Sequence, residues 1–318
     1  MYRIILDTDL AMGAPGSDID DGFALALAAA DPQITIEAVT TVNGNTDVES
    51  ATLLSLELLD RLGLQGVPVY RGAAAPLTHP DRAGVASDTL RAAYGHRVPD
   101  EGYAAVQIAQ RITAEPGQIT LVAIGPLTNV AAAIALDSRV AHDVAEIVIM
   151  GGVFAGQTGR ADMPGEFNIW MDPEAAQAVL ASGAPLRFVG LDVTERVRLT
   201  RAQGAALSEG PAGSFSRFAG AATHAWIDHR FSLYPKEPLA NESCAMHDPL
   251  AVAAVSHPEL LTWRSAHVSV VTGDGIARGV LITDLLEGVT PPTANCRVAL
   301  DVAVDAFADY FVSSLARL

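Results

Sequence analysis

Cysteine and basic residues are scarce in this sequence, and each scarcity excludes a class of protein. The 318 residues include two cysteines, Cys244 and Cys296, which make neither a disulfide framework nor a cysteine-rich zinc site. Lys and Arg number 20 against 37 Asp and Glu, so the formal net charge is −17. Because contacts to phosphates need Lys and Arg, we expect no nucleic-acid partner.

Long apolar runs are also lacking. No stretch approaches the ~18 uninterrupted apolar residues of a membrane span. The N-terminus turns acidic at Asp7 after a short apolar run, unlike a signal peptide. We therefore expect a soluble, cytoplasmic protein without membrane contact. Hydrophobic residues make up 50% of the chain, enough for a large core, and without a linker or repeat we expect a single domain over residues 1–318.

Short apolar runs alternate with longer Ala- and Leu-rich segments. The pattern predicts strands at 4–6, 34–42, 119–124 and 147–150, and helices at 23–30, 48–62, 127–136 and 173–181. The strands are continuously apolar, which is typical of a sheet covered on both faces. We predict an α/β fold with an open, mostly parallel sheet and helices on both faces.

The pattern changes after about residue 200. We predict a helical stretch from 201 toward 233, interrupted at Gly210-Pro211, and a further helix after Asp248. A small β-hairpin should follow, with strands at 267–271 and 280–283 joined through 273–275. The chain should end in a helix from Asp301 onward. The C-terminal third therefore adds helices and a hairpin to the sheet.

The loop between the first strand and the first helix is rich in carboxylates. It contains five aspartates, at positions 7, 9, 18, 20 and 21. Like charges this close repel unless a cation or protons neutralise them. Helix capping explains Asp20 or Asp21 but leaves a cluster. Carboxylates without thiols favour calcium or magnesium over zinc, and in an open parallel sheet ligands bind beyond the strand ends.

Two further segments carry candidate site residues. His247-Asp248-Pro249 is either a second acid site or a helix start with an N-cap Asp and an early Pro; taken alone, the cap is the better interpretation. In 164–173, Asp172 reads as another cap. Glu166 and Asn168 lie two residues apart, so an extended segment would point both to one side.

At these residues the chain resembles the inosine-uridine nucleoside hydrolase family, from Ile5 to about Val255. Six motifs follow in the family's order: the Asp-rich loop, Gly44-Asn45, Gly125-Pro126-Leu127-Thr128-Asn129, Met150-Gly151-Gly152, Glu166-Phe167-Asn168 and His247-Asp248-Pro249-Leu250-Ala251. Each motif is weak alone, but six in order at strand ends and helix starts are specific. The family fold is an open α/β sheet.

The resemblance implies that the protein hydrolyses the N-glycosidic bond of ribonucleosides to ribose and free base with a calcium-bound water. The implied Ca²⁺ ligands are Asp9, Asp21, Asp248 and the backbone carbonyl of Ile124. The implied substrate contacts are Asp20, Asn45, Met150, Glu166, Asn168 and His247. Asp9 is the implied general base, and His247 the implied catalytic contact to the leaving group. A homodimer or homotetramer and a role in purine or pyrimidine salvage are also expected.

Elementary chemistry agrees with these roles. Glycosidic cleavage passes through an oxocarbenium-like state, which an anionic pocket stabilises. A divalent cation lowers the pKa of a water that it holds, and a nearby carboxylate accepts the proton. Chelation of the ribose diol would select ribose over 2′-deoxyribose.

The sequence departs from the family pattern in two places. Ten residues separate Asp9 from Asp20, more than in the common family form, and Asp18 could assist or replace Asp9. Arg160 stands where many members carry Asn. It is either a surface residue, which we favour, or a contact to a modified 5′ position such as a phosphate.

The leaving-group acid and the rival functions stay open at this stage. Besides His247, the candidates are His224, His229, Trp226 and Asp228, while His79 and His96 lie in a loop that could cover the site. The rival functions are another metal-assisted hydrolysis, a non-catalytic ribose- or nucleoside-binding protein, and hydrolysis of a 5′-modified nucleoside. Release of product from a nucleoside separates an enzyme from a binder.

Overall fold

The structure is a computed structural model that describes residues 1–210, 214–286 and 288–318. The expected interruption at Gly210-Pro211 therefore lies partly outside the described residues. Within them, one sheet has eight strands in the order β3 (Val69–Arg71), β2 (Ile34–Thr41), β1 (Tyr2–Thr8), β4 (Ile119–Ala123), β5 (Glu146–Met150), β6 (Leu186–Val189), β12 (Cys296–Val302) and β9 (Leu261–Ala266).

All neighbouring strands of this sheet are parallel except β12 and β9. Two small antiparallel pairs accompany it, β7 (Arg198–Thr200) with β8 (Ser243–Ala245) and β10 (Val268–Val270) with β11 (Leu281–Thr283). The second pair confirms the predicted hairpin. The sheet confirms the predicted open, mostly parallel architecture.

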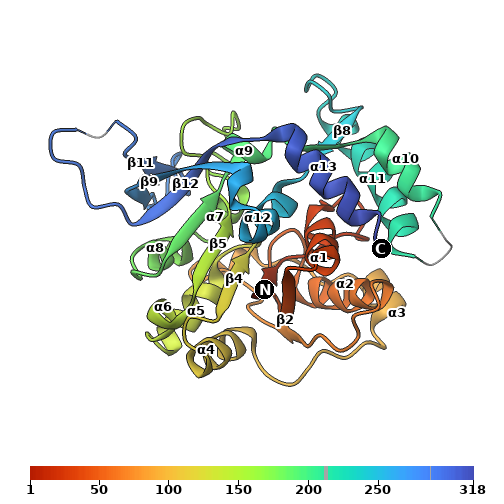
Figure 1. The fold of residues 1–318 in the computed structure, drawn as a ribbon, viewed down its shortest axis with the longest axis horizontal. Coiled ribbons are helices and arrows are strands. Elements are labelled where there is room, and N and C mark those ends of the chain that lie inside the picture. The colour runs from red at the N-terminus through yellow and green to blue at the C-terminus, as the bar shows by residue number, and fades with distance from the viewer. Residues whose placement is uncertain (211–213, 287) are drawn as a thin grey trace.

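The helices follow the strands along the chain (Figure 1). They are α1 (Asp20–Ala30), α2 (Val48–Arg61), α3 (Asp88–Tyr94), α4 (Ala104–Ala114), α5 (Thr128–Leu136), α6 (Val140–Asp143), α7 (Phe167–Met171), α8 (Pro173–Leu180), α9 (Leu191–Thr194), α10 (Arg201–Ser208), α11 (Phe215–Leu233), α12 (His247–Ser256) and α13 (Val304–Leu315), with short 3₁₀ turns at Pro80–Arg82 and Pro258–Leu260. No helix of the described residues is long and apolar enough to cross a membrane.

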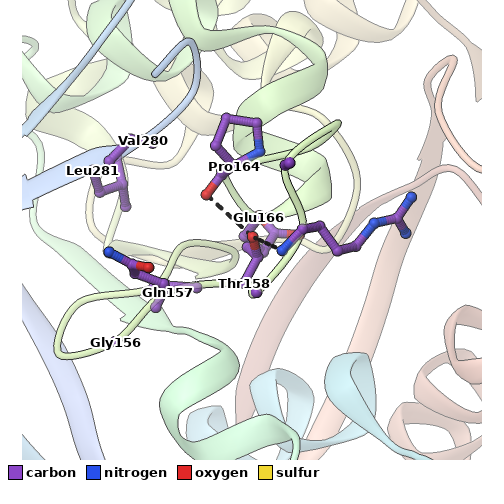
Figure 2. A pocket seen from close by; sticks show the side chains of 12 residues that line it. Gly156, Gln157, Thr158, Pro164, Glu166, Val280 and Leu281 are labelled. Carbon is purple, nitrogen blue, oxygen red and sulfur yellow. Dashed lines mark hydrogen bonds between the residues drawn. The ribbon is translucent and has the colours of Figure 1, made fainter. Parts of the chain in front are cut away.

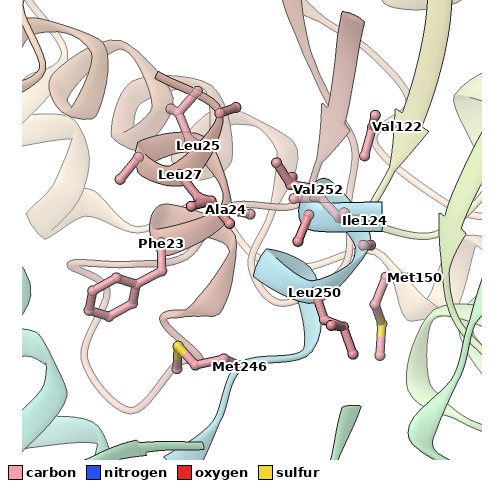
Figure 3. Packing of buried hydrophobic residues seen from close by; sticks show 14 of the residues in the cluster. Phe23, Ala24, Leu25, Leu27, Val122, Ile124, Met150, Met246, Leu250 and Val252 are labelled. Carbon is pink, nitrogen blue, oxygen red and sulfur yellow. The ribbon is translucent and has the colours of Figure 1, made fainter. Parts of the chain in front are cut away.

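The sheet is buried on both faces because its side chains alternate between two cores. Ile4 and Leu6 of β1 belong to one hydrophobic cluster and Ile5 to the other. The first cluster includes residues of α1, α2, α12 and α13, and Figure 3 shows Phe23, Leu250 and neighbours packed within it. The second includes residues of α4, α5 and α8. Helices therefore cover both faces, as predicted.

Four strands of the sheet, β3, β6, β12 and β9, escaped the sequence analysis, and one expectation about the C-terminal segment is wrong. Asp301 lies within β12, and the last helix begins at Val304. The central strands are apolar throughout because both their faces are covered. In β9, at the edge of the sheet, four of the six residues are at least partly exposed, so β9 has no apolar run to detect.

The strand order reverses at β1. The chain runs from β1 outward to β2 and β3, then returns to place β4, β5 and β6 on the other side of β1. A reversal of this kind opens a crevice beyond the carboxyl ends of the two central strands, where ligands bind in open α/β sheets. The end of β1 carries Asp9, and the end of β4 carries Ile124.

The ring of Phe23 anchors α1 in the first core. Its centroid lies 6.0 Å from that of Phe215 and 5.7 Å from that of Phe311. We predict that Phe23→Ala lowers the free energy of unfolding by about 3–5 kcal/mol, as expected for loss of a buried aromatic ring. Urea unfolding checks this value. Phe231→Ala is the control, because Phe231 is 40% exposed. An equal loss of stability in both variants would contradict the role of Phe23 as the anchor of α1.

A candidate active site in an acidic pocket

Asp9 is held at the end of β1 by the turn after β2. A Cβ on Gly44 would lie 2.0 Å from Asp9 Oδ2, so glycine is required at this close approach. The next backbone amide, Asn45 N, donates a hydrogen bond of 2.6 Å to Asp9 Oδ2. Asp9 Oδ1 is buried and has no hydrogen-bond partner among the described residues. One oxygen of Asp9 is thus fixed while the other lacks a partner.

Asp20 and Asp21 start α1, but neither caps it. The N-cap residue is Ile19, and no side chain satisfies the free amides there. Asp21 instead accepts hydrogen bonds from the Thr8 hydroxyl and from Asn45 Nδ2, the latter at 3.0 Å. Asp20 Oδ2 accepts from the backbone amide of Asp248 at 3.1 Å. The capping interpretation of Asp20 and Asp21 is therefore wrong.

Asp248 likewise does not cap α12, whose N-cap residue Met246 makes no side-chain cap. Its carboxylate joins those of Asp20 and Asp21: one oxygen from each lies within 4.8 Å of the others. All three side chains are buried. The sequence analysis had preferred the capping role for Asp248 alone, and the tertiary structure overturns it by bringing residues 20 and 248 together.

Burial and mutual repulsion disfavour charge on this group. Burial, with Coulomb repulsion from neighbouring aspartates, raises the pKa of Asp9, Asp20 and Asp248 well above the ordinary value. Burial also raises the pKa of Asp21 to about 6, although hydrogen bonds from Thr8 and Asn45 oppose the shift. A cation bound among these oxygens would relieve the repulsion.

Asn168 holds two strand ends together. Its Nδ2 donates to the carbonyl of Ile124 at 2.9 Å and to that of Met150 at 3.2 Å. Both partners are carbonyl oxygens, so the amide nitrogen must face them. Because a carbonyl oxygen has two lone pairs, Ile124 can accept from Asn168 and still offer a lone pair to a cation.

The spacing of Glu166 and Asn168 suggested that both lie on one extended segment, but the structure places them at the start of a helix. Glu166 is the N-cap of α7, and Asn168 lies in the first turn of that helix. The Glu166 carboxylate accepts from the backbone amides of Asn168, Gly152 and Ile169 at 2.8, 3.0 and 3.2 Å, and burial raises its pKa. Glu166 therefore fixes the Gly-Gly turn after β5 against α7.

These side chains line one pocket of about 680 Å³. The predicted residues in its lining are Asp20, Asn45, Ile124, Met150, Glu166, Asn168, His247 and Asp248, together with Asp18 and Arg160. Asp9 and Asp21 lie behind them, hydrogen-bonded to Asn45. His247 Nδ1 lies 2.8 Å from Thr194 Oγ1, which leaves Nε2 for the pocket. The structure thus brings the predicted site together.

The other candidates divide between the pocket and its surroundings. Trp226 lines the pocket and stacks on His229, with ring centroids 5.7 Å apart. Asp228 pairs with Arg201 at 2.8 Å. Among the described residues, neither His224 nor Asp228 appears in the pocket lining, and the same holds for His79 and His96. Asp18 lines the pocket, and its Oδ1 accepts from the amide of Ile19 at 2.7 Å.

The sequence analysis missed one wall of the pocket. Arg230, Tyr234 and Glu237 line it from the end of α11. Trp226, Arg230 and Tyr234 are spaced four residues apart, which places them on one face of a helix. That spacing was visible in the sequence, but nothing there indicated that the face turns toward residues 20 and 248.

A second cavity of about 380 Å³ adjoins the pocket. Figure 2 shows Gln157, Thr158 and Glu166 on one side of it and Val280 with Leu281 on the other. Thr158, Arg160 and Glu166 line both spaces. The loop between β5 and α7 therefore contributes residues to the walls of both spaces.

The fold and the pocket define an α/β protein with an acidic ligand site at the switch point of its sheet. Residues 4–309 match the model of the family described as inosine-uridine preferring nucleoside hydrolase. The chain is 35% identical to the non-specific ribonucleoside hydrolase RihC of Escherichia coli, over 98% of each chain. It is therefore a member of the inosine-uridine preferring nucleoside hydrolase family, and an enzyme.

Solved structures agree in fold. A plant nucleoside hydrolase, PpNRh1, matches with a TM-score of 0.83 and 28% identity over 99% of this chain and 98% of that one. The purine-preferring ribonucleoside hydrolase of Gardnerella vaginalis matches with the same TM-score at 26% identity, over the same shares of the two chains.

The pKa shifts predict an unusual pH dependence of stability in chelator-treated protein. Burial raises the pKa of Asp7 to about 7 and that of Asp21 to about 6. Both carboxyl groups therefore bind protons more tightly in the folded state than in the unfolded state. Their stabilising contribution is present below the unfolded pKa and is lost as pH rises through the folded pKa. We expect the free energy of unfolding to fall between pH 5 and pH 8.

Asp21→Asn should reduce that fall by at least about 1 kcal/mol, from the shift of Asp21 alone. Urea unfolding at both pH values with a chelator measures it, with Asp309→Asn on the exposed face of α13 as control. An unchanged pH dependence in Asp21→Asn would show that this carboxyl titrates normally.

Proposed function

We propose that the protein is a ribonucleoside hydrolase that cleaves the N-glycosidic bond to give ribose and free base, with Ca²⁺ as its cofactor. The observation that carries the proposal is the buried group of Asp20, Asp21 and Asp248 beside the unpartnered oxygen of Asp9. It lies at the switch point of a sheet whose family comprises nucleoside hydrolases.

The donor set fits a hard divalent cation. Asp9, Asp21, Asp248 and the carbonyl of Ile124 would hold it, and the closeness of Asp20 to Asp21 and Asp248 adds a further oxygen. Oxygen-only ligands suit calcium or magnesium. When bound, the cation supplies a water of lowered pKa and an anchor for the ribose 2′- and 3′-hydroxyls.

The protein's own residues then bind and orient the sugar. Asp20 and Asn45 line the pocket beside the acidic group and would accept from and donate to the diol. Met150 would support the ring from below, and Asn168 keeps Met150 and Ile124 in register. The Glu166 carboxylate retains lone pairs beyond its three backbone partners for a sugar hydroxyl. The anionic surroundings favour positive charge on the ring in the transition state.

Two proton transfers belong to the proposed reaction: Asp9 accepts a proton from the attacking water, and the departing base gains one. Asp9 is a suitable general base because the Asn45 amide fixes its Oδ2 while its Oδ1 has no hydrogen-bond partner among the described residues. Nε2 of His247 is positioned for the departing base, since Thr194 holds Nδ1. His224, His229 and Trp226 remain alternatives, and a base leaving without a protein acid is a further one.

A reducing-sugar assay tests the reaction. Inosine, uridine, adenosine, guanosine and cytidine are each incubated with the protein, with and without a calcium chelator. We expect ribose release that the chelator abolishes and that calcium restores; the ranking of substrates gives the base preference. Binding of nucleosides without any release would instead identify a ribose-binding protein that does not turn over.

Asp21→Ala should abolish calcium binding and lower kcat/KM by more than about 1,000-fold, since it removes a buried ligand from the cation site. Isothermal titration with calcium and the ribose assay measure the two effects. Asp31→Ala is the matched control: Asp31 is buried and hydrogen-bonded to Ser256 and Tyr310 away from the pocket. Wild-type activity in Asp21→Ala would rule out the metal assignment.

Asn168→Ala should lower kcat more than it raises KM, because it releases the carbonyls of Ile124 and Met150 from the positions that the transition state needs. Steady-state kinetics with the best nucleoside separate the two constants. Asn295→Ala is the control, since Asn295 Nδ2 also donates to two carbonyls, of Leu180 and Val268. A change in KM alone would argue against this role.

The proposal has a wider context that the family resemblance supplies. We expect the protein to serve nucleobase salvage in the cytoplasm and to self-associate as a dimer or tetramer. Light scattering on the purified protein measures the last of these directly.

A further inference from the structure

Two arginines meet at one tyrosine ring on the wall of the pocket. Arg160 comes from the loop between β5 and α7, and Arg230 from the last turn of α11; both line the pocket, as does Tyr234. The guanidinium carbon of Arg160 lies 5.9 Å from the centroid of the Tyr234 ring, and that of Arg230 lies 5.1 Å from it. We call these three residues the arginine rim.

The positive charge of the arginine rim contrasts with the acidic side chains in the rest of the pocket. The net charge of the chain is −17, and the pocket lining includes Asp18, Asp20 and Asp248. A neutral nucleoside does not require two guanidiniums beside such a site. A pocket with carboxylates at one place and guanidiniums at another suits a ligand that combines a cation-bound part with an anionic part.

The carboxylates that now pair with the rim can give way to a ligand. Arg160 Nη2 lies 2.8 Å from Asp162 Oδ2, whose side chain is 73% exposed. Arg230 Nη2 lies 2.6 Å from Glu237 Oε2, with both side chains about one-third exposed. Ion pairs this accessible to water are weak, so an anion that enters the pocket can replace or join them.

There is space beside Arg160 for a substituent. Arg160 and Thr158 line both the main pocket and the adjoining cavity of about 380 Å³. Figure 2 shows Thr158 in the lining of that cavity. A group attached to the sugar or the base can therefore reach the guanidinium without entering the space between Asn168 and the acidic residues.

We propose that the arginine rim binds a negatively charged substituent of the substrate, so that the protein favours anionic ribonucleosides over neutral ones. This inference rests on the proposed function, which places the 2′- and 3′-hydroxyls at the acidic group. An anionic group can then be attached at two places: as a phosphate on O5′, or as a carboxylate on the base. Guanidinium recognises either one through paired N–H donors.

The experiment compares uridine, uridine 5′-monophosphate and orotidine as substrates. For each anionic compound we take its kcat/KM relative to that of uridine. We expect Arg160→Met and Arg230→Met to lower this ratio by roughly 10- to 100-fold for the preferred anion, as a lost charged hydrogen bond does. Asp162→Asn should raise the ratio, because it frees Arg160 from its competitor. The responding compound distinguishes the phosphate from the carboxylate.

A matched ion pair elsewhere provides the control. Arg139 and Asp137 are also two residues apart, with Nη2 and Oδ2 at 2.6 Å and side chains 67% and 28% exposed, but neither lines either cavity. Arg139→Met and Asp137→Asn should leave both ratios unchanged. Ratios that stay the same in Arg160→Met and Arg230→Met would overturn the inference.

Turnover of uridine separates this inference from the proposed function. If wild type releases ribose from neither uridine nor orotidine, and no ribose 5-phosphate from uridine 5′-monophosphate, the hydrolase proposal fails, and titration calorimetry then supplies the ratio from dissociation constants. An arginine-dependent preference for an anion in binding would still support the rim. Equal binding of all three compounds to wild type and to both arginine variants would overturn it.

Discussion

Repulsion among buried carboxylates is the physical constraint that the rest of this structure has to satisfy. Asp9, Asp20, Asp21 and Asp248 are all buried, and their environment raises the pKa of each one. Removing several like charges from water is costly unless something of opposite charge is supplied. A fold that concentrates them in this way is destabilised at neutral pH, and the proposed cation would relieve that cost.

The scaffold keeps these carboxylates close by rigid means. Asp9 follows β1, Asp20 and Asp21 begin α1, and Asp248 lies in the first turn of α12. Residues more than two hundred positions apart thus become neighbours through the packing of α1 on α12. Gly44 permits the approach of the turn after β2 to Asp9, and Asn168 ties the ends of β4 and β5. The oxygens that would hold the proposed cation are therefore positioned by backbone contacts and by buried amide groups.

Charge is divided within the same pocket. The acidic group lies at the strand ends, whereas Arg160 and Arg230 approach Tyr234 from a loop and from the end of a helix. The strand ends are fixed by the sheet, and loops vary more readily without cost to the core. The proposed function assigns the acidic group to hydrolysis, and the proposed anion site assigns the arginine rim to the choice among substrates.

Periodicity in the sequence predicted four of the eight strands of the sheet, but not the buried strand β6, whose apolar run is interrupted by Arg187. The continuous apolar strands β1, β2, β4 and β5 and their following helices were predicted because burial on both faces leaves a strong pattern. The edge strand β9 was missed because exposure on one side breaks that pattern. The order of the strands, and hence the crevice at β1, depends on how distant segments pack together. The sequence of any one segment does not contain that information.

The site divides in the same way. The sequence by itself determined the chemistry available: five aspartates in one loop, a Gly-Asn turn and an ordered set of motifs that resemble one family. Only the tertiary structure decided that Asp248 joins the acidic group and does not cap α12, that Glu166 caps α7, and that Arg160 and Arg230 both approach Tyr234. Capping and ligation use the same residue types at the same local positions, so only contacts between distant segments distinguish them.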